Sequence, residues 1–158
     1  MFKNGLVVSA PNMSLLQTQI RFLGHEIVNR TIRPIQISLE FANKFLDEIK
    51  DKTQLQRFLG CVNYVHDFFK DLGIVCKPLY QRLKKKPEPW IEQHTKIVQH
   101  IKEKIKYLPC LNIPQPNAQI IVEIEASDLG FGGILKQKIN DQSKEEFVRF
   151  FSGAWNDT

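Results

Sequence analysis

The strongest periodic pattern in the chain lies between residues 53 and 72, where apolar residues recur every three or four positions. Thr53 followed by Gln56 matches a capping box, in which two side chains satisfy free backbone amides at a helix start. Gly73 is a residue type that often ends helices. The pattern therefore predicts an amphipathic helix whose apolar face consists of Leu55, Phe58, Leu59, Val62, Val65, Phe69 and Leu72.

Three further helices are predicted around this one. Ser38 suits the N-cap of a helix in which Phe41, Phe45 and Ile49 follow at intervals of four. Pro78 suits the first turn of a short helix over 78–83. A last helix over 91–108 ends before Pro109 and carries one apolar stripe, Ile91, Val98, Ile101, Ile105 and Leu108. Together these segments predict a small helical bundle.

Strand patterns lie on both sides of the predicted bundle. Residues 5–9 and 19–28 are rich in strand formers, with Gly24 as a bend, and residues 29–31 indicate a turn. After a proline-bearing linker over 111–118, strands are expected at 120–125, 133–138 and 147–152. The short connections between these three strands predict an antiparallel meander.

The positive charge of the chain is concentrated in its middle part. Residues 44–108 hold 14 Lys and Arg against 8 Asp and Glu, a balance of +6, while the rest of the chain holds 8 against 9. A basic segment suits a polyanion partner because phosphate contacts release counterions, although a solvated lysine-rich surface explains the same balance. No apolar run approaches the ~20 residues of a membrane span. Three widely spaced cysteines suit reduced thiols in an intracellular protein.

Five motifs, in order along the chain, resemble the reverse transcriptase–RNase H region of plant pararetroviruses, the caulimovirus and badnavirus group, and more distantly gypsy-type LTR retrotransposons. They are FLGH at 22–25, LQRFLGCVNY at 55–64, KPLY at 77–80 with Trp90 after it, EASD at 125–128 with GGIL at 132–135, and FFSGAWN at 150–156.

The resemblance implies an α+β chain with three parts. Residues 1–34 would be the end of a polymerase palm with its primer-grip hairpin, and residues 35–110 a helical thumb and connection. Residues 118–158 would be the first three antiparallel strands of an incomplete RNase H-like domain. Its uncovered apolar face would leave residues 120–152 poorly ordered or prone to self-association.

By the same resemblance, the hairpin and the bundle would contact nucleic acid. The primer grip would comprise Arg21, Phe22, Leu23, Gly24 and His25, although Phe22 and Leu23 packing a strand pair is an equal alternative. The bundle would lie along the minor groove of an RNA–DNA hybrid or DNA duplex and touch its backbone. The candidate phosphate contacts are Lys84, Lys85, Lys86, Lys102 and Lys106, each of which could equally be a solvated surface lysine.

In this family, carboxylate clusters hold pairs of Mg²⁺ ions for polymerisation and for RNase H cleavage. The chain has no Asp-Asp dipeptide, and by resemblance it begins after the YxDD hairpin. Glu125 stands at the first RNase H aspartate, with its carboxylate displaced by ~1.5 Å, and the other ligands would lie beyond Thr158. We therefore expect Glu125, the one candidate catalytic and metal-binding residue, to be vestigial and Asp128 to be a turn residue. This chain alone would then hold no cofactor.

Three functions remain open from the sequence. The first is a polyprotein fragment, from an integrated viral copy, that binds RNA–DNA or DNA duplex backbones without sequence preference and without catalysis. The second is an excerpt of a working RNA-directed DNA polymerase with RNase H activity. The third is a non-catalytic basic helical module that binds DNA or a protein. None implies a membrane or a small-molecule substrate, and the resemblance implies the cytoplasm or nucleus.

Overall fold

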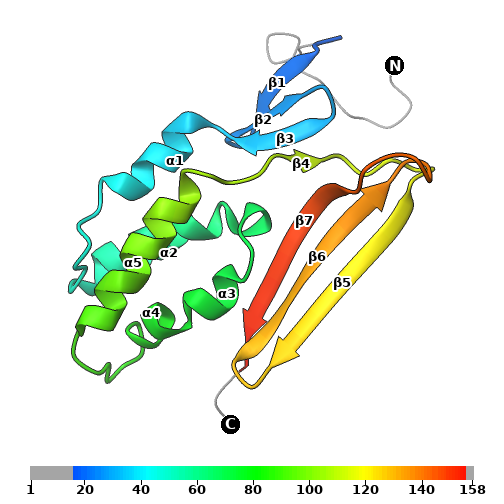
Figure 1. Ribbon diagram of the computed structural model, residues 1–158. Helices are drawn as coiled ribbons and strands as arrows, with labels where there is room; N and C mark the ends of the chain where they lie inside the picture. Colours follow the sequence, from blue (N-terminus) through cyan, green and yellow to red (C-terminus); the bar gives the residue numbers. More distant parts are fainter. Residues whose placement is uncertain (1–15, 156–158) are drawn as a thin grey trace, which may run out of the picture.

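The computed structural model describes residues 16–155, apart from the side chain of Ser38. The strand expected at 5–9 and the end of the last motif lie outside these residues. The described chain consists of two antiparallel sheets and a set of helices between them in sequence (Figure 1). This mixed helix-and-sheet architecture confirms the predicted α+β class.

The first sheet has four strands in the order β1-β2-β3-β4. A hairpin was expected over 19–28, and it forms with a turn at Leu23 and Gly24, whose φ angles are 47° and 75°. A second turn at Asn29 and Arg30 also has positive φ, as tight hairpin turns require. The strands are β1 (Gln19–Phe22), β2 (His25–Val28), β3 (Thr31–Pro34) and β4 (Leu111–Asn112).

Two of these strands were missed by the sequence reading. β3 is four residues long and ends at Pro34, and β4 consists of two residues inside the segment interpreted as a linker. Strands this short have too few residues to show alternation. β4 pairs with β3, so the segment after the last helix returns to the first sheet.

The helices form the main core of the molecule. Fourteen residues make one buried cluster, which includes Leu55, Phe58, Leu79 and Ile101. The helical elements are α1 (Gln36–Asn43), α2 (Lys52–Asn63), the 3-10 helix η2 (His66–Phe68), α3 (Leu72–Val75), α4 (Lys77–Gln81) and α5 (Glu92–Ile105). The predicted helices at 78–83 and 91–108 correspond to α4 and α5, which end two and three residues earlier than predicted.

The other predicted helix boundaries were wrong. α2 begins after Asp51, whose carboxylate accepts a hydrogen bond from the Gln54 amide at 2.8 Å, so Thr53 lies inside the first turn. It ends at Asn63. The predicted apolar residues beyond it are also buried, but Val65 and Phe69 lie at the two ends of η2 and Leu72 lies in α3. α1 starts before Ser38 and ends before Phe45. Apolar spacing predicts which side chains are buried, but separate short elements can bury the same residues as one long helix.

The second sheet is the predicted meander, in the order β5-β6-β7. Its strands, β5 (Gln119–Ser127), β6 (Gly130–Lys138) and β7 (Glu146–Ala154), are longer than expected. Asp128 and Leu129 alone form the first turn, as expected for Asp128. Gly132 and Gly133 lie inside β6, where they give room to the Asp71 carboxylate and the Phe151 ring.

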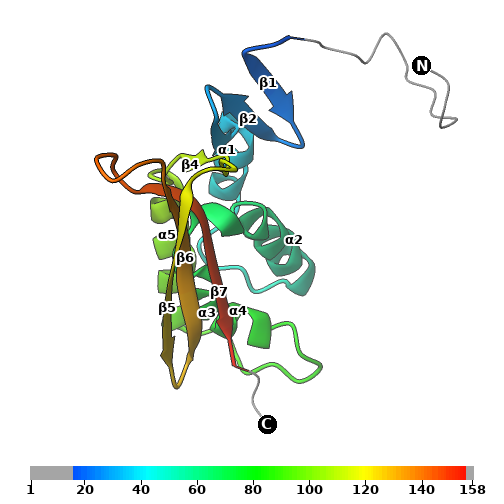
Figure 2. The ribbon, with the colours of Figure 1, turned by 90° about the vertical axis from the view of Figure 1, so that its right-hand side faces the viewer.

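The second sheet contacts the helices through β7, while β5 forms its far edge (Figures 1 and 2). Phe68, Leu111 and Phe150 form a small second core at this contact. The Gly73 amide donates to Ser152 Oγ at 2.8 Å, which ties α3 to β7. β7 is therefore the strand that attaches the sheet to the helices, and β5 is the strand at the opposite edge.

Candidate nucleic-acid interface

The turn between β1 and β2 presents two large apolar side chains to solvent. Phe22 is 60% exposed and Leu23 is 75% exposed. The Arg21 side chain beside them is also largely exposed. An apolar residue in a turn with positive φ is unfavourable both for backbone conformation and for hydration.

Tyr64, at the end of α2, holds this tip in place. Its hydroxyl donates to the carbonyl oxygen of Leu23 and lies 3.1 Å from His25 Nδ1. The His25 ring stacks on Tyr64 at 4.6 Å and on Phe68 at 5.4 Å between ring centres. The FLGH and LQRFLGCVNY motifs thus meet in space.

Gly24 explains why this approach is possible. Its φ of 75° favours glycine, and a Cβ there would overlap the Tyr64 hydroxyl. Glycine is therefore required at this position by the positive φ of the turn and by the close approach of the Tyr64 hydroxyl.

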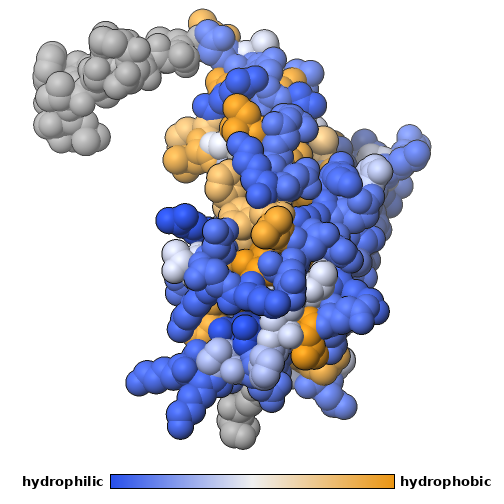
Figure 3. Space-filling model, turned by 90° about the vertical axis from the view of Figure 1, so that its left-hand side faces the viewer, coloured by the Kyte–Doolittle hydropathy of each residue, from blue (hydrophilic) through white to orange (hydrophobic). Residues whose placement is uncertain are grey.

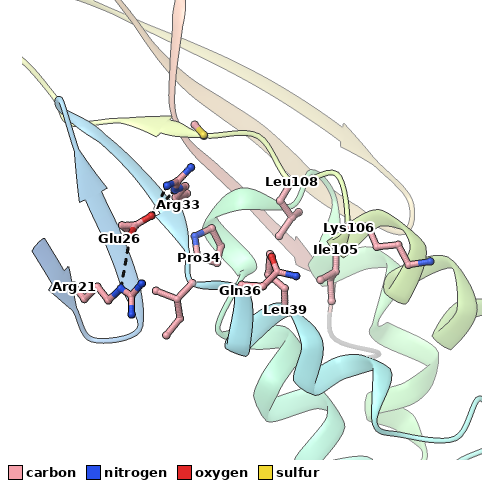
Figure 4. A pocket seen from close by; sticks show the side chains of 11 residues that line it. Arg21, Glu26, Arg33, Pro34, Gln36, Leu39, Ile105, Lys106 and Leu108 are labelled. Carbon is pink, nitrogen blue, oxygen red and sulfur yellow. Dashed lines mark hydrogen bonds and ion pairs between the residues drawn. The ribbon is translucent and has the colours of Figure 1, made fainter. Parts of the chain in front are cut away.

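A cavity of about 370 Å³ lies beneath the hairpin, between β2, β3, α1 and the end of α5 (Figure 4). Glu26, on β2, is buried in this wall of the cavity. It accepts hydrogen bonds from Arg33 Nε at 2.7 Å and Gln19 Nε2 at 2.5 Å. Arg21 adds an ion pair at 3.7 Å. The bond from Arg33, with that from Gln19, lowers the pKa of Glu26. Two guanidinium groups share one carboxylate, so the wall keeps a positive balance.

An apolar groove of about 470 Å³ runs between α1 and α2. Tyr64 lines it together with Phe41 and Ile37, which is 72% exposed. Apolar side chains gather in the upper part of this face of the molecule, whereas most of the remainder is polar (Figure 3). Tyr64 therefore both contacts the hairpin turn and lines this groove.

The candidate lysines do not gather beside the hairpin. Lys84, Lys85 and Lys86 are exposed in the connection between α4 and α5, at the end of the bundle away from the first sheet (Figure 1). Lys106 pairs with Glu103 at 2.7 Å, which raises the pKa of the lysine. Lys102 is only 13% exposed and donates to Asp47 Oδ1 at 2.6 Å and to the Phe45 carbonyl at 2.5 Å. Lys102 thus connects α5 to the segment after α1.

Glu125 lies on β5 with an exposed side chain. Its neighbours across the sheet are Gly132 on β6 and Ser152 on β7, and the Asp71 carboxylate lies beside Gly132 on the same face. Within residues 16–155, no three His, Cys, Asp or Glu side chains are close enough to hold a metal ion.

The sequence reading missed three residues that shape these sites, Tyr64, Arg33 and Asp71. Tyr64 ends a quoted motif, but nothing in that motif names its partner 39 residues earlier. Arg33 belongs to the unrecognised strand β3. The signal for Asp71 was Gly132, because a glycine inside a strand often marks a close approach by another group.

Comparisons with known proteins point to one group. Residues 90–158 match the family described as an RNase H-like domain found in reverse transcriptase. The enzymatic polyprotein of cauliflower mosaic virus (strain D/H) is 38% identical over 97% of this chain, and that of figwort mosaic virus (strain DxS) is 36% identical. The genome polyprotein of petunia vein clearing virus is 35% identical. The chain spans 23%, 23% and 7% of these three proteins, respectively.

Solved structures share the fold. A foamy viral protease–reverse transcriptase in complex with an RNA/DNA hybrid matches 96% of this chain and 20% of that one, with a TM-score of 0.74 and 19% identity. The same enzyme in complex with double-stranded DNA matches 91% of this chain and 30% of that one, with a TM-score of 0.72 and 18% identity. None of the helices within residues 16–155 has the length and apolarity that a membrane crossing needs.

Proposed function

Because this chain is related to the reverse transcriptase–RNase H region of pararetroviral polyproteins, we propose that it is a duplex-binding segment of such a polyprotein. The ligand is the backbone of an RNA–DNA hybrid or a DNA duplex, bound without sequence preference. On its own, the segment carries out no catalysis.

The observation that carries this proposal is the contact of Tyr64 with the exposed hairpin turn at Leu23 and Gly24. Phe22 and Leu23 remain exposed, while the Tyr64 hydroxyl contacts the Leu23 carbonyl and His25 Nδ1. A rigid, exposed apolar turn beside a guanidinium-lined cavity suits the sugar–phosphate backbone, which offers both apolar sugar faces and negative charge. The fold is also shared with a protein solved on a hybrid and on double-stranded DNA.

Charge would contribute the rest of the affinity. Arg21 next to the tip, and Lys84, Lys85 and Lys86 at the other end of the bundle, are exposed cations. A long duplex can reach both ends of a bundle, and contacts to phosphates do not depend on base identity. Lys102 is left out of this set because its side chain is only 13% exposed.

Fluorescence anisotropy with a labelled RNA–DNA hybrid, at low and at high salt, tests the binding. We expect affinity to fall steeply with salt, and the log–log slope to decrease by about 0.9 for each phosphate contact removed. The triple change of Lys84, Lys85 and Lys86 to Ala should reduce that slope. Lys144→Ala, in the exposed loop before β7, is the matched control and should leave it unchanged. No binding at low salt contradicts the proposal.

A magnesium-dependent cleavage assay on the same hybrid tests the lack of catalysis. The reason to expect none is that, within residues 16–155, no three His, Cys, Asp or Glu side chains gather at Glu125 to hold a metal ion. Cleavage that disappears on Glu125→Ala would show that this carboxylate still works.

The second candidate is an excerpt of a working polymerase. It is favoured by the small part of the curated relatives that the chain spans, 23% of the cauliflower mosaic virus polyprotein. In that case the remaining carboxylates would come from other parts of a longer protein. An intact YxDD frame upstream in the transcript supports this candidate, and an interrupted frame argues against it.

A further inference from the structure

The chain between α5 and β5 is bonded to the first sheet. β4 pairs with β3, and just beyond β4 the Ile113 amide donates to the Arg30 carbonyl at 2.8 Å (Figure 1). The Arg30 side chain in turn donates from Nη1 to Gln115 Oε1 at 3.0 Å. Residues 111–115, the connecting segment, are therefore held on the first sheet by backbone and side-chain bonds.

The connecting segment is also bonded to the second sheet, through Gln137 on β6. This side chain is fully buried, although glutamine is mostly an exposed residue type. Its Oε1 accepts a hydrogen bond from the Gln115 amide at 2.9 Å, and its Nε2 donates to the Ile113 carbonyl at 3.3 Å and to Glu146 Oε2 at 2.8 Å. The three bonds use the amide oxygen and both N–H groups.

A buried amide restricts its partners more strictly than an apolar side chain of the same size. Breaking its hydrogen bonds inside the protein costs free energy, so Gln137 favours the one position of the connecting segment that satisfies all three. The two segment residues that it contacts also bond to Arg30. Asn112 Nδ2 adds an exposed bond to the Phe147 carbonyl at 3.2 Å. The segment is thus held from both sheets at once.

The attachment of the second sheet to the helices lies farther along β6. The Gly73 amide donates to Ser152, which is opposite Gly132 on β6. Gly132 and Gln137 are five residues apart in sequence, which corresponds to about 17 Å at ~3.4 Å per residue. Two attachments at this separation fix the orientation of a sheet, whereas the loss of one allows rotation about the other.

We propose that the connecting segment couples the two sheets into one rigid body, and that Gln137 is the residue that positions the second sheet within it. A movement of the first sheet is then transmitted through β3 and the connecting segment to β6. If the proposed function holds, a duplex bound at the hairpin turn would face the second sheet in one fixed orientation. The coupling itself does not require nucleic acid, so it can hold or fail independently of duplex binding.

Double electron–electron resonance on the 158-residue chain, without nucleic acid, tests the coupling. Nitroxide labels at Ile20→Cys in β1 and at Lys144→Cys in the exposed loop before β7 report the distance between the two sheets. The background carries Cys61→Ala and Cys110→Ser, which remove the two native thiols that are not buried. We expect a single narrow distance distribution.

The substitution Gln137→Met should widen this distribution about twofold or more, because the freed end of the sheet rotates about its helix attachment. Methionine has a similar size but forms none of the three hydrogen bonds. Gln119→Met, the same change at an exposed position of β5, is the matched control and should leave the width unchanged. An unchanged width in Gln137→Met, or equal widening in both variants, overturns the proposal.

Hydrogen exchange of Gln137→Met distinguishes a released segment from a destabilised protein. The amides of Ile113 and Gln115 are close in sequence but bond to different sheets, the first to the Arg30 carbonyl and the second to Gln137. We expect exchange of the Gln115 amide to accelerate about tenfold more than that of Ile113. Similar acceleration of both amides would mean general destabilisation and would overturn the positioning role of Gln137.

Discussion

At the scale of single residues, the hairpin depends on side chains that each satisfy more than one neighbour. The Tyr64 hydroxyl contacts both the Leu23 carbonyl and His25 Nδ1, and its ring stacks on the imidazole. Glu26 bonds to Arg33 and Gln19. Removal of one such side chain leaves several polar groups without a partner.

Tyr64→Phe should destabilise the protein by about 0.5–1.5 kcal/mol, the usual net value of a hydrogen bond. The ring and its stacking on His25 remain, so the loss reports the hydroxyl alone. Urea unfolding measures the change, with Tyr107→Phe as control because Tyr107 is 77% exposed. In the anisotropy assay, Tyr64→Phe should also weaken hybrid binding, since it frees the tip. Equal losses of unfolding free energy and of hybrid affinity in the two variants would show that the Tyr64 hydroxyl does not stabilise the hairpin turn.

Glu26 should make the hairpin sensitive to acid. Its bonds to Arg33 and Gln19 lower its pKa in the folded protein below the ordinary value of 4.5. A lowered folded pKa means that the stabilisation is fully present above pH 4.5 and is lost as the pH falls through the lower folded value. Stability of the native protein should therefore fall more steeply below pH 4.5 than that of Glu26→Gln. Glu40→Gln, on the exposed side of α1, should retain the native pH profile.

At the scale of elements, the start of α2 distinguishes the sequence pattern from the structure. A capping box predicts Thr53 as the cap, whereas the observed cap is Asp51, bonded to the Gln54 amide. Both residues are good N-cap types, so the pattern alone does not distinguish them. The path of the chain from α1 into α2 makes Asp51 the last residue with an extended backbone, at φ −71° and ψ 128°.

Asp51→Ala should therefore cost about 1 kcal/mol of unfolding free energy, the typical value of an N-cap. Thr53→Ala should cost less than about 0.5 kcal/mol, as for other exposed surface positions. Chemical denaturation of both variants measures the difference. A larger loss for Thr53→Ala would restore the capping box and place the helix start two residues later.

At the scale of the whole molecule, two cores of unequal size hold the chain together. Within residues 16–155, the helices bury fourteen residues in one cluster, whereas the cluster that joins them to β7 has three buried residues, Phe68, Leu111 and Phe150, with partly buried side chains packed against it. The ion pair between Arg149 and Asp67, at 2.9 Å, also spans this contact, but both side chains are around half exposed and contribute little. The second sheet thus depends on few buried contacts.

Phe150→Ala should destabilise the attachment of the sheet by about 3 kcal/mol, the lower end for a buried phenylalanine. Phe147→Ala is the control on the same strand, because Phe147 is 39% exposed. Near-UV circular dichroism and urea unfolding should show a separate early transition for the first variant only. A single unchanged transition in both would mean that the sheet is held by other contacts.

Hydrogen exchange should show the same inequality in the native chain. Amides within residues 53–108 should be better protected than those within 120–152, because opening free energies follow the density of buried contacts. Equal protection of the two regions would contradict this ranking.

The sequence by itself predicted most of the buried side chains of the helices, although Phe41 and Ile91 are 40% and 51% exposed, the two hairpin regions, and the resemblance to reverse transcriptase–RNase H polyproteins. These properties follow from local spacing, turn-forming residues and motifs, all of which act over a few neighbours along the chain. The apolar positions of α2 and α5 and the β5–β7 meander were therefore predictable from residues such as Leu55, Ile101 and Val122.

Only the tertiary structure decided how these pieces meet. The contact of Tyr64 with Leu23 and His25, the bond of Lys102 to Asp47, and the pairing of β4 with β3 join residues far apart in sequence. No local pattern encodes such contacts, because they depend on where the chain returns after each element. For the same reason, the sequence did not predict that the connection between α4 and α5, which carries the candidate lysines at 84–86, lies at the opposite end of the bundle from the hairpin.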